Sequence, residues 1–146
     1  MKKILLAFLL IVLTSCSLLD TASEITTVCR YQEDPWDIEY IFVSQNDELI
    51  EEDTVQEYTW LGYMSEQDIM DELKSLEDLY AGRSGISYTY DLQEEQVIET
   101  FHIDYEQATI EDLIEVGLLE ESDDSQVYVS LQATLDNLEP LGFDCK

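Results

Sequence analysis

The stretch Ile86-Ser87-Tyr88-Thr89-Tyr90-Asp91-Leu92 alternates apolar and polar side chains without interruption. Because successive side chains of a strand point to opposite faces, this pattern is typical of a half-buried β-strand. Glu94-Glu95 then turns the chain, and the segment 97–105 has the composition of a return strand. The sequence therefore predicts a β-hairpin with one face toward a core.

Upstream of this hairpin, three further segments are rich in β-branched and aromatic residues: residues 21–32, 36–44 and 49–63. Asp34-Pro35 separates the first two segments and Gln45-Asn46-Asp47 the second and third, as turn residues do. The acidic run Glu51-Glu52-Asp53 in the third segment predicts a bulge or an exposed stretch. Together the three segments predict an antiparallel meander.

Helical spacing of leucine and isoleucine appears in three places. The first helix begins after Ser65 and stops near Gly82, the second begins near Thr109 and ends at Gly117, and the third follows Ser130 and breaks near Pro140. A short strand is expected at 127–129. Each helix has one apolar stripe, which must pack on the sheet. The expected fold class is therefore α+β, an antiparallel sheet of about five to six strands with helices packed on one face.

The N-terminus has the order of a secretory signal. Met1-Lys2-Lys3 is basic, the ten residues 4–13 are apolar, and small residues at 14 and 15 precede Cys16. This apolar run is too short to span a bilayer, but it has the length that signal peptides use. We expect cleavage before Cys16 and a diacylglyceryl group on its sulfur. An ordinary thiol near a differently placed cleavage site is the alternative.

These features predict a signal peptide over 1–15, a lipidated tether over 16–23 and a single domain over 24–146. The expected location is extracytoplasmic, with the protein anchored to the cell membrane by two acyl chains on Cys16. The host could have one membrane or two. No other cofactor is expected.

The charge is strongly acidic. The whole chain carries a formal net charge of −28, with 34 acidic residues and six Lys and Arg. Nucleic acid is excluded as a partner, because phosphate binding needs clustered basic residues. The acidic charge is compatible with a basic protein or peptide, or a cation, as a partner. The simplest interpretation is that the negative charge keeps the protein soluble.

Two cysteines remain beside Cys16. In an oxidising compartment, Cys29 and Cys145 are expected to form a disulfide that connects the first strand to the C-terminus. Two free thiols, or a metal site with His102, are the alternatives. No metal site is expected, because the spacing of zinc ligands is absent.

His102 and Asp104 are the candidates for acid–base chemistry, since alternation places both on the face opposite Phe101 and Ile103. No nucleophile elbow accompanies them, so no catalytic residue is assigned and a solvent-facing histidine is the simpler interpretation. Arg83, between Gly82 and Gly85, is expected to be a salt-bridge partner and is a weak functional candidate.

Two acidic clusters, Glu51-Glu52-Asp53 and residues 120–124, could bind Ca²⁺ weakly, although neither has the spacing of a calcium loop. A solvated acidic face is the simpler interpretation. Aromatic residues at strand spacing could form a platform for a sugar or peptide, but core packing is more common. They are Tyr58, Trp60, Tyr63, Tyr88 and Tyr90.

From Trp60 to Phe143 the chain resembles the YehR-like family of small bacterial lipoproteins of unknown function. The resemblance rests on the strand end around Gly62, the long helix through Leu79-Tyr80, the hairpin start 85–90, Glu99, the strand end 103–105, Asp112-Leu113, Ser130 and Gly142-Phe143. It implies an α+β lipoprotein and supplies no binding or catalytic residues. This chain is more acidic than the lysine-rich pattern of the family, and it adds Cys29 and Cys145.

The function expected from the sequence is a non-catalytic binding or interaction module at the cell envelope. One alternative is a small extracytoplasmic enzyme that uses His102 and Asp104 or a carboxylate pair. The other is an envelope protein that binds cations weakly. The sequence names no ligand.

Overall fold

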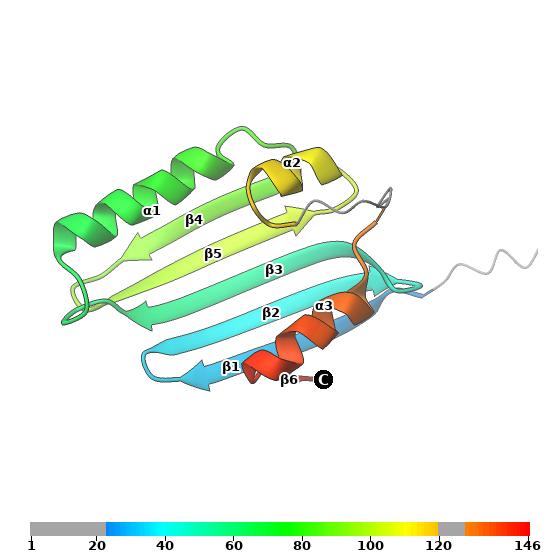
Figure 1. Cartoon of the computed structure of the whole chain (residues 1–146), viewed down its shortest axis with the longest axis horizontal. Helices are drawn as coiled ribbons and strands as arrows, with labels where there is room; N and C mark the ends of the chain where they lie inside the picture. Colours follow the sequence, from blue (N-terminus) through cyan, green and yellow to red (C-terminus); the bar gives the residue numbers. More distant parts are fainter. Residues whose placement is uncertain (1–22, 120–127) are drawn as a thin grey trace, which may run out of the picture.

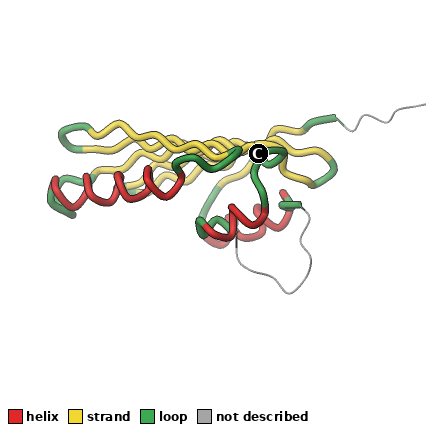
Figure 2. Tube along the Cα trace, turned by 90° about the horizontal axis from the view of Figure 1, so that it is seen from above, coloured by secondary structure: helices red, strands yellow, loops and turns green. Residues whose placement is uncertain are grey.

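The protein forms a six-stranded antiparallel sheet with all helices on one face (Figures 1 and 2). This computed structural model describes residues 23–119 and 128–146. The elements are β1 (Ile25–Glu33), β2 (Trp36–Gln45), β3 (Glu48–Thr59), α1 (Glu66–Tyr80), β4 (Ile86–Leu92), β5 (Gln96–Asp104), α2 (Ile110–Glu115), α3 (Leu131–Leu138), the 3₁₀ helix η1 (Glu139–Leu141) and β6 (Asp144–Cys145). The α+β class and the one-sided placement of the helices are confirmed.

The strand order is β4-β5-β3-β2-β1-β6. The predicted meander forms β1, β2 and β3, and the predicted hairpin forms β4 and β5, which joins the meander along β3. The Asn46-Asp47 turn has positive φ at both residues, 51° and 73°, a conformation that asparagine and aspartate tolerate better than other side chains.

The third strand was predicted to continue to Tyr63, and this was wrong, since β3 ends at Thr59. The chain turns after Trp60, whose carbonyl accepts hydrogen bonds from the backbone N–H groups of Tyr63 and Met64. The indole N–H of Trp60 donates to the carbonyl of Gln93. The bulge lies next to the predicted place. The register shifts from Val43↔Glu51 to Ser44↔Leu49, which leaves Ile50 as the extra residue.

Each helix begins at a hydroxyl cap. The side chains of Ser65, Thr109 and Ser130 accept hydrogen bonds from the backbone N–H groups of Asp68, Asp112 and Ala133. These caps satisfy donors that the first helical turn leaves unpaired. The strand predicted at 127–129 begins outside the described residues, and Ser130, directly after it, forms an isolated bridge with Glu48.

Buried residues form two clusters on the helix face. One lies under α1 and contains Tyr58, Trp60, Ile69, Leu73 and Val97. The other lies under α2 and α3 and includes Phe42, Leu49, Ile103, Leu113 and Val129. In Figure 1, α1 lies over the β4–β5 side of the sheet and α3 over the β1–β2 side. The middle of the sheet therefore lies between two separate helical covers.

Cys29 and Cys145 form the predicted disulfide, which links β1 to β6. The predicted lipidation residue Cys16, the signal peptide 1–15 and most of the tether lie outside the described residues. In the part that the structure describes, no helix is both long and apolar enough to cross a membrane.

Candidate functional site

A groove crosses the helix face of the sheet, bordered by α2 and α3 at one end and by α1 at the other. It consists of two adjoining cavities of about 290 Å³ and 210 Å³, both of which are lined by Tyr40, Glu52 and Leu118. We call this feature the helix-face groove. Its walls are largely apolar and its floor carries a few polar groups, a combination that is typical of small-ligand sites.

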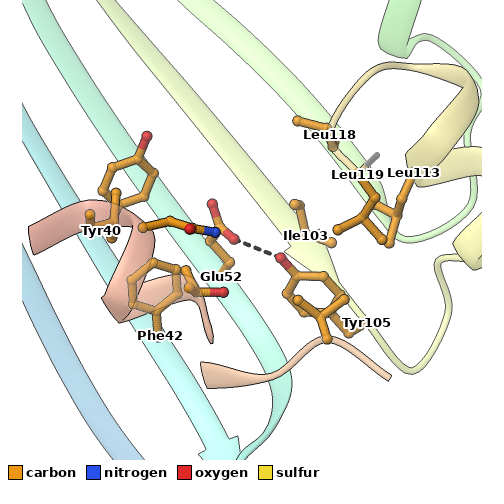
Figure 3. Close-up of a pocket in the computed structure, with 12 residues that line it drawn as sticks. Tyr40, Phe42, Glu52, Ile103, Tyr105, Leu113, Leu118 and Leu119 are labelled. Carbon is orange, nitrogen blue, oxygen red and sulfur yellow. Dashed lines mark hydrogen bonds between the residues drawn. The ribbon is translucent and has the colours of Figure 1, made fainter. Parts of the chain in front are cut away.

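Glu52 lies on the floor of this groove, in the central strand β3 (Figure 3). Its strand neighbours are Phe42 of β2 and Ile103 of β5. The Tyr105 hydroxyl donates to Oε2 of Glu52 at 2.7 Å, and the Thr54 hydroxyl donates to Oε1 at 3.2 Å. Burial raises the pKa of Glu52 above its ordinary value, and the two hydroxyl donors oppose this rise.

Glu99 of β5 is the second acid in the groove and lines the smaller cavity. The Tyr58 hydroxyl donates to Glu99 Oε1 at 2.7 Å. Burial raises the pKa of Glu99, and the nearby carboxylate of Glu72 adds to this rise. The hydroxyl oxygen of Tyr88, also on the groove, is buried and has no hydrogen-bond partner among the described residues.

The two groove acids have no cationic partner among the described ion pairs. Arg30 pairs with Glu39, Arg83 with Asp112 and Glu115, and Lys146 with Asp144. Glu52 and Glu99 are instead held by neutral hydroxyl groups. A partly desolvated carboxylate without a counter-ion is an electrostatic feature that a cationic ligand would complement.

The predicted pair of His102 and Asp104 does not form. His102 lies on the open face of the sheet, as expected, but its Nδ1 is 2.8 Å from Oδ1 of Asp53 in β3. Asp104 instead accepts hydrogen bonds from the backbone N–H groups of Glu106 and Gln107, which follow β5. Sequence proximity suggested the wrong carboxylate because strand pairing brings Asp53 directly opposite His102.

Strand pairing also places Ser87 of β4 opposite His102 on the other side. Ser87, His102 and Asp53 therefore form a row across three neighbouring strands on the open face. No hydrogen bond joins Ser87 to His102 among the described contacts. His102 is half-exposed, with 35% of its side-chain surface accessible, and Asp53 is 52% accessible.

Arg83 has the salt-bridge role that was expected of it. Its Nη1 lies 3.0 Å from Asp112 Oδ1 and 2.7 Å from Glu115 Oε2, and Nη2 donates to Glu115 Oε1 at 2.9 Å. Hydrogen bonds from Arg83 lower the pKa of Glu115 and add to the lowering of that of Asp112. The guanidinium thus ties the loop after α1 to α2.

The acidic run Glu51-Glu52-Asp53 does not converge on one point. Glu52 pairs with the buried Ile103 of β5 and faces the helices, whereas Asp53 pairs with His102 and faces the open side. Glu51 faces the open side with Asp53. The second acidic cluster, 120–124, lies outside the described residues. Within residues 23–119 and 128–146, no three His, Cys, Asp or Glu side chains form a group that could hold a metal ion.

The five aromatic candidates separate into different environments. Tyr58 and Trp60 are buried in the cluster under α1, whereas Tyr63 is 67% exposed in the following turn. Tyr88 and Tyr90 are partly buried on the helix face of β4. These residues form no common platform, and Tyr88 alone among them lines the helix-face groove.

Sequence reasoning missed the helix-face groove. Glu52 and Glu99 sit at inward positions of otherwise half-buried strands, and an acid at such a position was the available signal. It was hidden because 34 acidic residues are spread over the chain. Glu99 entered the prediction only as part of the family resemblance.

Comparison with known proteins places the fold. A family model for proteins of unknown function, DUF1307, matches residues 26–144. The uncharacterized lipoprotein Lmo0207 of Listeria monocytogenes is 26% identical over 86 residues, which is 59% of this chain and 56% of that protein. The chain therefore matches little more than half the length of this relative.

Two solved structures share the fold. The NMR structure of the Escherichia coli YehR protein matches with a TM-score of 0.67 and 15% identity, covering 86% of this chain and 92% of that one. An NMR structure of a protein from Streptococcus pneumoniae TIGR4 matches with a TM-score of 0.57 and 8% identity, covering 100% of this chain and 96% of that one. The resemblance to the YehR-like lipoproteins is thereby confirmed.

Proposed function

The chain belongs to the DUF1307 family of proteins of unknown function, and from that premise we propose that it is a lipid-anchored, non-catalytic binding module whose ligand enters the helix-face groove. The observation that carries this proposal is the groove itself. Its two cavities of about 290 Å³ and 210 Å³ adjoin at Glu52. Together they fall within the range of about 300–1,000 Å³ that is typical of small-molecule sites.

The composition of the groove supports binding more than catalysis. Apolar side chains such as Phe42, Leu113 and Leu118 offer contact area, while Glu52 and Glu99 offer fixed polar groups. Each acid is already held by a tyrosine hydroxyl. Such an arrangement orients a ligand and supplies neither an activated nucleophile nor a set of oxyanion donors.

A ligand screen by NMR tests the groove. The extracytoplasmic domain is mixed with small neutral, acidic and basic compounds, and binding is read from the ligand signals. Leu118→Trp should abolish binding, because Leu118 lines both cavities and the indole would fill them. Leu79→Trp is the matched control, since Leu79 is 40% exposed on α1. Equal effects of the two changes, or no binding in any class, would refute the groove as a site.

The anchor is the second part of the proposal. Cys16 directly follows the apolar run and small residues of a lipoprotein signal, and the Listeria relative is named a lipoprotein. Two acyl chains give stable membrane association, whereas one gives marginal binding. Cys16→Ala should therefore move the protein from the membrane fraction to the soluble fraction or leave an uncleaved precursor. Mature protein that stays in the membrane fraction would contradict the anchor.

A small extracytoplasmic hydrolase is the second candidate, favoured by the row of Ser87, His102 and Asp53 on the open face. In catalytic triads a carboxylate hydrogen-bonded to Nδ1 orients the histidine ring, and Asp53 lies in this position beside His102. Labelling with a fluorophosphonate tests it. Labelling that disappears in Ser87→Ala would support this enzyme over the binding module, and unlabelled wild-type protein would reject it.

Weak cation binding through the acidic surface is the remaining alternative. Thermal unfolding with and without millimolar Ca²⁺ tests it, since a ligand that binds the folded state raises the unfolding temperature. An unchanged transition would reject a specific calcium site.

A further inference from the structure

We propose that the ligand of the helix-face groove is a linear polyamine, a flexible chain with an ammonium group at each end. The inference rests on the proposed function, because it names the chemical class of ligand for the same site. It follows from the number of groove acids, their spacing and the aromatic walls between them.

Glu52 and Glu99 are the first argument. Both line the groove, and the hydrogen bonds described for them come from hydroxyl groups. Hydrogen bonds from neutral donors compensate a desolvated carboxylate less well than bonds from a cation do. An ammonium group that enters the groove gains this attraction without displacing a protein cation, because no described ion pair uses either acid.

The spacing of the two acids is the second argument. Glu99 pairs with Gln56, which lies four residues beyond Glu52 along β3. At about 3.3 Å per residue, the two backbone positions are roughly 13 Å apart along the strands. A flexible chain with an ammonium group at each end can contact both acids across the smaller cavity, which both of them line. Spermine has a chain of this kind, whereas putrescine is short for the gap.

The surface between the acids is the third argument. Tyr40, Phe101 and Tyr80 line the smaller cavity, and the rings of Tyr80 and Phe101 meet edge to face with centroids 4.9 Å apart. Methylene groups of a polyamine pack on such rings, and secondary ammonium groups are attracted to their faces. An anion would gain less here, since the carboxylates of Glu52 and Glu99 repel it.

Isothermal titration of the extracytoplasmic domain with spermine, at physiological ionic strength, tests the proposal. Glu52→Gln and Glu99→Gln should each weaken spermine binding about tenfold or more, the effect of losing a hydrogen bond to a charged group. The controls are Asp53→Asn and Glu57→Gln, which remove the same charge from β3 on its open face. They should change the affinity less than twofold. Circular dichroism verifies that each variant folds.

Chain length gives a second readout. Putrescine should bind more weakly than spermine to the wild-type domain. Because putrescine is short and contacts one acid at a time, its affinity should fall more in one of the variants Glu52→Gln and Glu99→Gln than in the other. Equal losses in all four variants would show general attraction to an acidic protein and overturn the proposal. Failure of spermine to bind while a neutral compound still occupies the groove would overturn the ligand class and leave the binding module intact. Absence of binding in every class would refute both.

Discussion

Acidic side chains have different surroundings on the two faces of the sheet. Glu52 and Asp53 are neighbours in β3, yet Glu52 lies under the helices and Asp53 on the open face. Asp53 pairs with the half-exposed His102, and Glu39 on the same face pairs with Arg30. Glu52 has hydroxyl donors instead. Acidity therefore carries no functional information until the side-chain direction is known.

The largest expected difference between the faces is in packing. Val97 is fully buried under α1, and Val55 is 41% exposed on the open face. Val97→Ala should lower the free energy of unfolding by about 2 kcal/mol, because it leaves a cavity. Val55→Ala should cost less than about 1 kcal/mol, since little apolar surface returns to water. Urea denaturation measures both, and equal losses would mean that the open face is covered in solution.

The next difference concerns the two neighbouring acids. Glu52→Gln should raise the free energy of unfolding at neutral pH by about 1 kcal/mol, because it removes a desolvated charge and keeps an acceptor for the Tyr105 hydroxyl. Asp53→Asn should change it by less than about 0.5 kcal/mol, as exposed pairs usually do. A clear loss of stability in Glu52→Gln would show that a charge at this position is compensated by the protein itself.

The pH dependence sharpens this contrast. Burial raises the pKa of Glu52 in the folded state above 4.5, its ordinary value in the unfolded chain. The folded protein therefore binds the proton more tightly than the unfolded chain does. The stabilisation of the folded state by protonated Glu52 is fully present below pH 4.5 and is lost as the pH rises through the folded-state pKa. Urea titrations from pH 4 to pH 8 should show the wild type losing stability relative to Glu52→Gln. Parallel curves would contradict this assignment.

The smallest effect is expected at the histidine. His102→Ala should change the free energy of unfolding by less than about 0.5 kcal/mol, because His102 and Asp53 form a half-exposed pair. The variant should also leave ligand binding in the groove unchanged. A larger destabilisation, or loss of binding, would mean that the two faces are coupled through β5.

Much of the fold could be predicted because local patterns and tertiary packing agree. The alternation at 86–92 is β4 as predicted, and the caps at Ser65 and Ser130 begin α1 and α3. The disulfide between Cys29 and Cys145 followed from counting cysteines outside the cytoplasm. The end of β3 was missed because Trp60 is held by the β4–β5 turn, a contact that local composition does not encode.

The candidate site could not be predicted, for a related reason. The groove depends on which strands are neighbours and on how far the helices extend over them, and both are decided by long-range packing. The pairing of β3 with β5 brings Asp53 to His102 and sets the distance between Glu52 and Glu99. These partners lie far apart in the chain; Asp53 and His102, for example, are separated by 49 positions.

The disulfide would have a mechanical consequence under the proposed N-terminal anchor. A pull on a tether that precedes β1 enters the domain at Ile25 and meets the covalent link at Cys29. Beyond that point the load divides between the strand and the C-terminal residue pair. Peeling of β1 from β2 beyond Cys29 would therefore also have to move Cys145 and the β6 strand that pairs with β1.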